Sequence, residues 1–259
     1  MAKYLTLEHL GQSAIITINH PPVNAWTVES LHELASTMTT LQSDCSVRSV
    51  VLTGAGDAFF CGGADLNLFT EGSKAQVEVL LDAFAAAFSS LRAYSGVTVA
   101  AINGYALGGG LECALMCDYM VAERGAKLGL PEAKVGLLPA GGGCKTLPDK
   151  VGISWAKRMI LGGEILSAEQ AYAIGLIEEI VDPGFAKIIA VSLAGKVANQ
   201  APLAVMQARR LIESSAGQSL QQHLQQERAA LLSLIGEPEQ KEGVAAFLGK
   251  RAPSWADDD

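Results

Sequence analysis

Short apolar runs alternate with segments of helical spacing over the first two thirds of the chain. The runs are rich in β-branched residues and end at Gly, Pro or polar positions, which is typical of strands. They are residues 4–7, 14–18, 47–53, 97–102 and 119–122. Between the second and third runs, apolar residues from Thr27 to Leu41 recur every three or four positions, as in an amphipathic helix. Strands that alternate with helices predict an α/β fold in which helices cover the sheets.

The pattern becomes predominantly helical from about residue 167. Ser167 followed by Gln170 matches a capping box, which predicts the start of a helix. Residues 185–235 then show long amphipathic repeats. These changes predict a catalytic core of residues 1–195 and a helical oligomerisation region of residues 196–259.

Composition narrows the possible classes of function. The chain has 259 residues, of which 49% are hydrophobic, and a net charge of −8. The apolar surplus favours self-association, and the acidic balance disfavours a nucleic-acid surface, which needs a basic patch. The sequence has neither an apolar run near the ~20 residues of a membrane span nor an apolar signal core at its start. We therefore expect a cytoplasmic protein without membrane contact.

Metal, redox and nucleotide motifs find little support in the sequence. The five cysteines form no CxxC pair, and the four histidines lie far apart without ligand spacing, so no metal site is expected. The sequence also lacks GxGxxG, GxSxG and phosphate-loop patterns. The remaining candidates are carboxylates and backbone amides that act on a small molecule.

Two glycine-rich loops offer backbone N–H groups to a ligand. The first reads FCGGADL at residues 60–66, and the second reads NGYALGGG at residues 103–110, where an apolar helix begins. Two convergent amides form an oxyanion hole, in which each donor contributes about 2.7–4 kcal/mol to a transition state that develops an oxyanion. The competing interpretation is that both loops are merely tight turns.

Two glutamates lie near these loops in the sequence. Glu112 falls in the first turn of the apolar helix, where the helix dipole alone would stabilise a glutamate. Glu132 follows Leu130-Pro131 in a Gly/Pro-rich loop, where an ordinary surface glutamate is also consistent. Two carboxylates beside two amide donors would suffice for proton transfer at a carbon next to a carbonyl.

Five segments occur in the order that is typical of one enzyme family. They read FCGGADL, VAAINGYALGGGLECALMCDYM, GLPEAKVGLLPAGGG, GEILSAEQAYAIGLIEEIV and EGVAAFLGKRAP. Over residues 4–253 the sequence resembles the crotonase superfamily, the enoyl-CoA hydratase/isomerase family. The resemblance implies a crotonase-like spiral of repeated ββα units, followed by a C-terminal helical trimerisation region. Trimers of this family commonly pair into hexamers.

The resemblance also implies an activity and roles for single residues. The activity is that of an enoyl-CoA hydratase, which adds water across the 2,3-double bond of a trans-2-enoyl-CoA to give a 3-hydroxyacyl-CoA. Coenzyme A is then part of the substrate, and no further cofactor is expected. Gly62 and Gly109 match the two oxyanion-hole donors. Glu112 matches the glutamate that holds the water, and Glu132 matches the one that exchanges the proton at the α-carbon.

The same resemblance implies where the substrate lies. The expected coenzyme A contacts are Val23, Asn24, Ala25, Gly63, Ala64, Asp65, Leu66 and, at the nucleotide phosphates, Lys250. A mobile wall near the acyl chain is expected between residues 66 and 88, with an ordinary amphipathic helix as the competing interpretation. Its apolar residues are Leu68, Phe69, Val77, Leu80, Leu81 and Phe84.

Two departures from the family pattern concern the acyl pocket. Trp26 stands where Leu or Met is usual, and Cys144-Lys145-Thr146 replaces the usual Thr-Gln-Arg. The alternatives to a simple hydratase are a double-bond isomerase and a specialised hydratase of a branched or carboxylated acyl-CoA. Isomerases of the family commonly lack a carboxylate at the position of Glu112, which favours the hydratase. A non-catalytic CoA-binding or RNA-associated scaffold is disfavoured by the acidic composition and the glutamate pair.

Overall fold

The computed structural model describes residues 4–256 of the chain. The chain divides into two compact units between Ala194 and Gly195. The first unit contains two sheets with their helices, and the second unit is helical. The first unit carries all the residues that line the candidate site described below.

Strands of two sheets alternate along the first unit. The larger sheet has the order β1-β2-β3-β5-β7-β10, in which β1 and β2 form an antiparallel hairpin and the other neighbours are parallel. The smaller sheet has the order β4-β6-β8-β9, in which only the β8–β9 pair is antiparallel. The strands of the larger sheet are Leu5–Leu10 (β1), Ser13–Ile18 (β2), Ser49–Gly54 (β3), Val97–Ile102 (β5), Tyr119–Glu123 (β7) and Glu179–Val181 (β10). Those of the smaller sheet are Phe59–Cys61 (β4), Tyr105–Leu107 (β6), Lys127–Gly129 (β8) and Ile165–Ser167 (β9).

A strand of the larger sheet, a strand of the smaller sheet and a helix follow one another three times. β3 and β4 lead to α2 (Lys74–Arg92), β5 and β6 to α3 (Gly109–Ala114), and β7 and β8 to α4 (Gly143–Leu161). Two 3-10 turns, η1 (Leu66–Phe69) and η2 (Glu132–Val135), precede α2 and α4. The predicted α/β fold of repeated ββα units is confirmed.

The helical prediction after residue 167 is correct for one short helix and for most of residues 185–235, and wrong for the stretch between them. Ser167 and Gln170 form the predicted capping box at the start of α5 (Ala168–Ala173). The helix ends before Gly175, which has a left-handed φ of 75°. The chain then returns to the larger sheet, where Glu179–Val181 pairs in parallel with β7. Pairing with a distant strand therefore overrides the local helical pattern.

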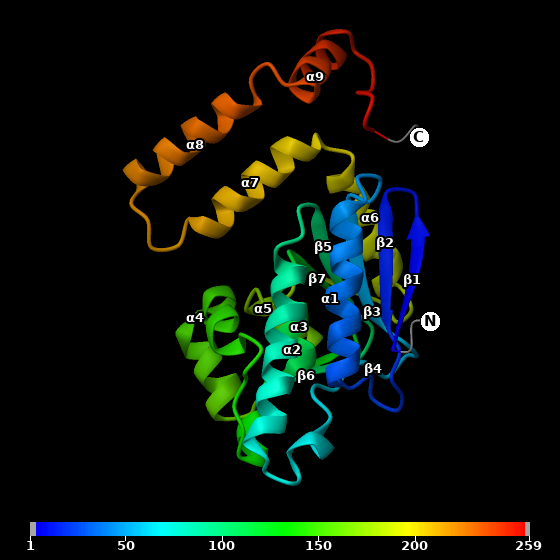
Figure 1. The fold of residues 1–259 in the computed structure, drawn as a ribbon, viewed down its shortest axis with the longest axis vertical. Coiled ribbons are helices and arrows are strands. Elements are labelled where there is room, and N and C mark those ends of the chain that lie inside the picture. The colour runs from blue at the N-terminus through cyan, green and yellow to red at the C-terminus, as the bar shows by residue number, and fades with distance from the viewer. Residues whose placement is uncertain (1–3, 257–259) are drawn as a thin grey trace. The chain divides into compact units, whose positions relative to one another are not determined.

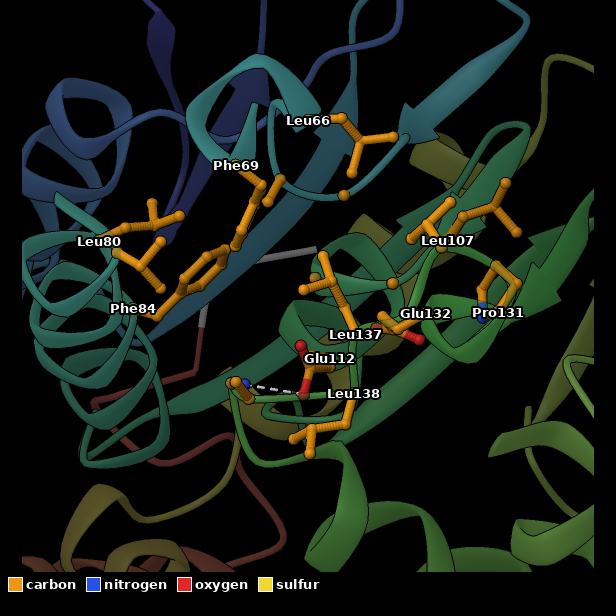
Figure 2. Close-up of a pocket in the computed structure, with 18 of the residues that line it drawn as sticks. Leu66, Phe69, Leu80, Phe84, Leu107, Glu112, Pro131, Glu132, Leu137 and Leu138 are labelled. Carbon is orange, nitrogen blue, oxygen red and sulfur yellow. Dashed lines mark hydrogen bonds between the residues drawn. The ribbon is translucent and has the colours of Figure 1, made fainter. Parts of the chain in front are cut away.

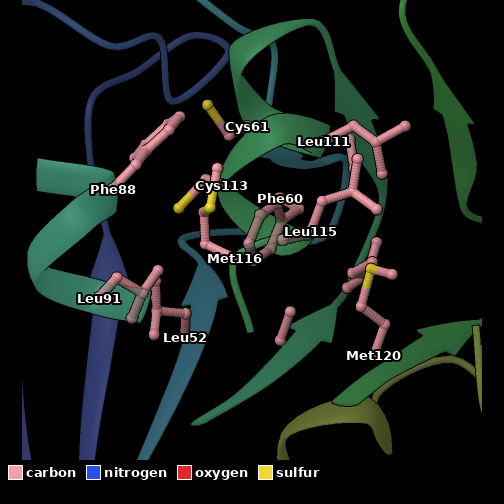
Figure 3. Packing of buried hydrophobic residues seen from close by; sticks show 14 of the residues in the cluster. Leu52, Phe60, Cys61, Phe88, Leu91, Leu111, Cys113, Leu115, Met116 and Met120 are labelled. Carbon is pink, nitrogen blue, oxygen red and sulfur yellow. The ribbon is translucent and has the colours of Figure 1, made fainter. Parts of the chain in front are cut away.

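The core of the first unit lies between the sheets and helices α1 (Val28–Ser43), α2 and α3. Figure 1 shows α1 and α2 running side by side. Figure 3 shows side chains from β3, β4, α2 and α3 packed together, among them Phe60, Phe88 and Leu111. All six residues of α3 are buried. This short helix therefore carries Glu112 into the interior.

The second unit begins within α6 (Ala186–Ala198) and continues through three helices. These helices are α7 (Pro202–Ser214), α8 (Leu220–Leu234) and α9 (Pro238–Leu248). The carboxylate of Glu239 accepts a hydrogen bond of 2.9 Å from the N–H of Leu203, which ties α9 to the start of α7. No single described helix is long and apolar enough to cross a membrane, although α6 and α7 meet the criteria of length and composition together, as a bent pair.

Gly110 makes a close contact between α3 and the smaller sheet. A Cβ at this position would lie 2.2 Å from the carbonyl oxygen of Cys61 in β4. We expect Gly110→Ala to lower the free energy of unfolding by about 3 kcal/mol, because backbone atoms must move apart. Denaturant unfolding measures this change. Gly125→Ala is the control, since nothing lies within 4 Å of a Cβ there, and equal stability of the two variants would contradict the packing.

Candidate active site

One cavity of about 610 Å³ brings the two glycine-rich loops and both glutamates together. Its walls come from the loop after β4, η1, α2, the start of α3 and the segment from Pro131 to Gly141. Figure 2 shows Glu112 and Glu132 at this cavity, with the apolar side chains of Phe84 and Leu137 nearby. The structure therefore places two carboxylates and the two loops against one space.

Glu112 is a buried carboxylate that the backbone of a glycine-rich segment holds in place. Glu112 is only 3% exposed to solvent. Oε1 accepts hydrogen bonds of 2.8 Å from the N–H groups of Gly141 and Gly143. Burial raises the pKa of Glu112, whereas these two bonds act in the opposite direction because they favour the ionised form. The other carboxylate oxygen, Oε2, also lies near this segment, since a Cβ on Gly141 would be 3.0 Å from it.

Glu132 lies in a different environment on the same cavity. Both of its carboxylate oxygens are buried and lack a hydrogen-bond partner among the described residues. Burial raises the pKa of Glu132 to about 7, and the nearby negative charge of Glu112 adds to the shift. Near neutral pH, Glu132 is therefore present in both its protonated and its ionised form. Two carboxyl groups with unequal environments provide an acid and a base.

The prediction that Gly62 is the first oxyanion-hole donor is wrong, because the N–H of Gly62 already has an acceptor within the protein. It donates a hydrogen bond of 2.8 Å to the carbonyl oxygen of Val23. The N–H groups of Ala64 and Gly109 donate no hydrogen bond within residues 4–256, and both residues line the cavity. The amides of Ala64 and Gly109 are therefore both available to a ligand in the cavity.

Glycine lets the two loops approach each other. A Cβ on Gly63 would lie 2.9 Å from the carbonyl oxygen of Leu107 and 3.4 Å from the nitrogen of Gly109. Gly63 also has a φ of +102°, and Gly108 has a φ of +51°, a region that L side chains rarely adopt. A side chain at Gly63 would push the loops apart and separate the amides of Ala64 and Gly109.

The structure separates the remaining predicted contacts into two groups. Gly63, Ala64 and Leu66 line the cavity, whereas its described lining does not include Val23, Asn24, Ala25 or Asp65. The role of Asn24 stays a prediction, and its buried side chain donates hydrogen bonds to the carbonyls of Ala55 and Phe59. Asp65 accepts a hydrogen bond from the N–H of Asn67 and caps η1. Lys250 lies in the second unit, and its role stays a prediction.

The predicted acyl wall and two missed features complete the site. Phe69, Val77, Leu80, Leu81 and Phe84 line the cavity, whereas Leu68 packs against the core instead.

Sequence reasoning missed the amides of residues 141 and 143, although the Gly-Gly-Gly run at 141–143 was a signal of bare backbone. Within residues 4–256, no group of three or more His, Cys, Asp or Glu side chains is arranged to hold a metal ion.

Comparison with known proteins identifies the family of this fold and site. The chain belongs to the enoyl-CoA hydratase/isomerase family, whose sequence model matches residues 11–258. It is 37% identical to the 2,3-dehydroadipyl-CoA hydratase of Escherichia coli K12 over 93% of this chain and 94% of that protein. The solved structure of Pseudomonas aeruginosa DspI matches with a TM-score of 0.95 and 48% identity, over 98% of this chain and 97% of that chain. An enoyl-CoA hydratase of Bacillus anthracis matches with a TM-score of 0.94 and 31% identity, over 99% and 100% of the two chains.

The raised pKa of Glu132 makes the stability of the protein depend on pH. Between the ordinary value of 4.5 and about 7, the folded state binds more protons at this site than the unfolded state, so ionisation of Glu132 lowers the free energy of unfolding as pH rises. We expect this fall to be smaller in Glu132→Gln than in the wild type when denaturant unfolding is measured from pH 5 to 8. Glu71→Gln, at an exposed position, is the control. Parallel curves for Glu132→Gln and the wild type would show that Glu132 titrates normally.

Proposed function

We propose that the protein is an enoyl-CoA hydratase, which adds water across the 2,3-double bond of a trans-2-enoyl-CoA and forms a 3-hydroxyacyl-CoA. The observation that carries this proposal is the pair Glu112 and Glu132 on one cavity, in unequal environments. Two unoccupied amides beside them supply donors for a thioester oxygen. The family and the names of the relatives above support the same activity.

The geometry suggests a role for each group in the addition of water. The N–H groups of Ala64 and Gly109 donate to the thioester oxygen and stabilise the negative charge that develops there. Glu112 is held by two amides that favour its ionised form, so it orients a water and accepts a proton from it as oxygen bonds to the β-carbon. Glu132 in its protonated form delivers a proton to the α-carbon. No cofactor is needed, because the thioester itself conjugates the double bond and coenzyme A belongs to the substrate.

Removing either carboxylate should stop hydration while leaving binding largely intact. We expect Glu112→Gln and Glu132→Gln each to lower kcat by roughly 10²–10⁴, the range of general acid–base catalysis. The loss of enoyl-thioester absorbance measures the rate with crotonyl-CoA and with longer trans-2-enoyl-CoAs. Glu71→Gln is the control for charge and should match the wild type. If Glu112→Gln hydrates all of these substrates at the wild-type rate, the proposed function is wrong.

Both carboxylates favour a hydratase over an isomerase, and the walls of the cavity favour an uncharged acyl group. Apolar side chains from η1, α2 and the segment from Val135 to Leu138 dominate the lining. Apart from the two glutamates, Lys134 is the one charged residue among the described lining residues. A carboxylate on the acyl chain would be costly to bury against such a surface without a partner. The carboxylated alternative therefore depends on Lys134.

A panel of substrates separates these alternatives. We expect kcat/KM for a straight-chain trans-2-enoyl-CoA to exceed that for an enoyl-CoA of equal length with a terminal carboxylate by at least about tenfold. The carboxylate would lose its hydration and be buried against apolar side chains. Hydration of each substrate measures the ratio. The control variant Lys134→Met should leave it unchanged or enlarge it. A preference for the carboxylated substrate that Lys134→Met abolishes would establish the specialised hydratase instead.

Self-association to a trimer or hexamer forms part of the proposal. Large apolar side chains of the second unit are exposed in the single chain, among them Phe247 at 83% and Leu248 at 75%. Burial of such side chains between subunits is favourable and supports an oligomeric protein. The cytoplasmic location and the lack of nucleic-acid partners stay predictions.

A further inference from the structure

Trp26 is a buried residue that contacts both loops of the site. It lies between β2 and α1 and is 0% exposed. Its indole carries one N–H group, which can only donate a hydrogen bond. That group requires a partner in the interior, since a buried donor without one is costly.

The backbone of Trp26 holds the first loop. Its N–H donates a hydrogen bond of 2.8 Å to the carbonyl of Gly63, and its carbonyl accepts one of 3.0 Å from the N–H of Asp65. These two bonds flank Ala64 in a parallel bridge. The arrangement fixes the backbone on both sides of Ala64 and leaves its own N–H unused.

The side chain of Trp26 holds the second loop. Its indole Nε1–H donates a hydrogen bond of 3.2 Å to the carbonyl oxygen of Gly109. The ring packs edge-on against Phe88, with 6.3 Å between ring centroids and an angle of 74° between the planes. This packing confines the indole to the orientation in which it reaches Gly109.

The start of α3 needs such an external contact. The helix has only six residues, its first two are glycines, and its N-cap Gly108 provides no side-chain hydrogen bond. Each glycine costs about 1 kcal/mol in a helix relative to alanine, so this first turn is weak by itself. A displacement of the turn would move the N–H of Gly109, and also Glu112 three residues further along.

We propose that Trp26 is a positioning residue that sets the spacing of the two oxyanion-hole amides, Ala64 through its backbone and Gly109 through its indole N–H. This inference rests on the proposed function, because the spacing matters only if a thioester oxygen binds between the amides. The side chain of Trp26 does not line the cavity, so it acts on the reaction through Gly109.

Trp26→Phe in the full chain tests the inference, because it removes the indole N–H and keeps an aromatic ring and every backbone bond. We expect kcat for a trans-2-enoyl-CoA to fall about tenfold, with KM within about twofold of the wild-type value. A displaced N–H group stabilises the transition state less well, but its effect on kcat is smaller than that of removing an oxyanion-hole donor altogether. Trp155→Phe in α4, whose ring lies 4.2 Å from the Arg158 guanidinium carbon, is the matched control and should retain the wild-type kcat. An unchanged kcat, or a change in KM alone, in Trp26→Phe would overturn the inference.

A spectroscopic readout separates the role of Trp26 from the proposed reaction. A saturated acyl-CoA with a ¹³C-labelled thioester carbonyl binds without turnover, and its C=O stretch shifts to lower wavenumber when the oxygen accepts hydrogen bonds. We expect a smaller shift with Trp26→Phe than with the wild type or Trp155→Phe. Equal shifts in all three proteins would overturn the role of Trp26 alone. No shift in the wild type would contradict the oxyanion hole and, with it, the proposed function.

An isosteric replacement keeps the inference testable if Trp26→Phe does not fold. In 3-benzothienylalanine at position 26, sulfur replaces the N–H and the shape of the bicyclic ring is retained. We expect the same fall in kcat and the same reduced carbonyl shift, with far-ultraviolet circular dichroism and the melting temperature close to those of the wild type. Wild-type values of kcat and of the carbonyl shift in this variant would overturn the inference.

Discussion

The site depends on one buried oxygen, Oε1 of Glu112, and on the two backbone amides that bind it. A carboxylate this deeply buried is stable only where hydrogen-bond donors replace the lost water. The N–H groups of Gly141 and Gly143 provide these donors at 2.8 Å. Gly141 lies in the loop before α4 and Gly143 is the first residue of α4, whereas Glu112 lies on α3, so the carboxylate reaches its working environment only when these segments are in place. The tight packing of Gly110 against β4 fixes α3 from its other side.

The second glutamate shows what the absence of such donors does. Glu132 faces the same cavity, yet its two oxygens have no partner among the described residues and its pKa rises to about 7. An unpartnered buried carboxyl lowers stability when it ionises, and such groups are typically found at functional sites. The contrast between a satisfied carboxylate and an unsatisfied one gives two chemically identical side chains different proton affinities. This contrast arises from backbone geometry, because the residue type is the same.

The sequence predicted much of this arrangement, and its errors have a common cause. The ββα repeats, the short helix that bears Glu112, and most of the apolar wall were predicted from spacing and family resemblance. The errors were Gly62 as a free donor and a helix in place of the strand Glu179–Val181. In both cases a partner distant in the sequence decides the outcome, because Val23 occupies the amide of Gly62 and β7 pairs with β10.

The sequence by itself determined the alternation of strands and helices over most of the chain, which residues carry carboxylates, and where glycine leaves the backbone bare. These properties follow from the side chains and from local backbone preferences. Only the tertiary structure decided that the amides of Ala64 and Gly109 are free, that one glutamate is satisfied and the other is not, and that the indole of Trp26 reaches Gly109. Hydrogen-bond partners and burial depend on contacts between segments that are distant in the sequence, and a local sequence pattern carries no information about those contacts.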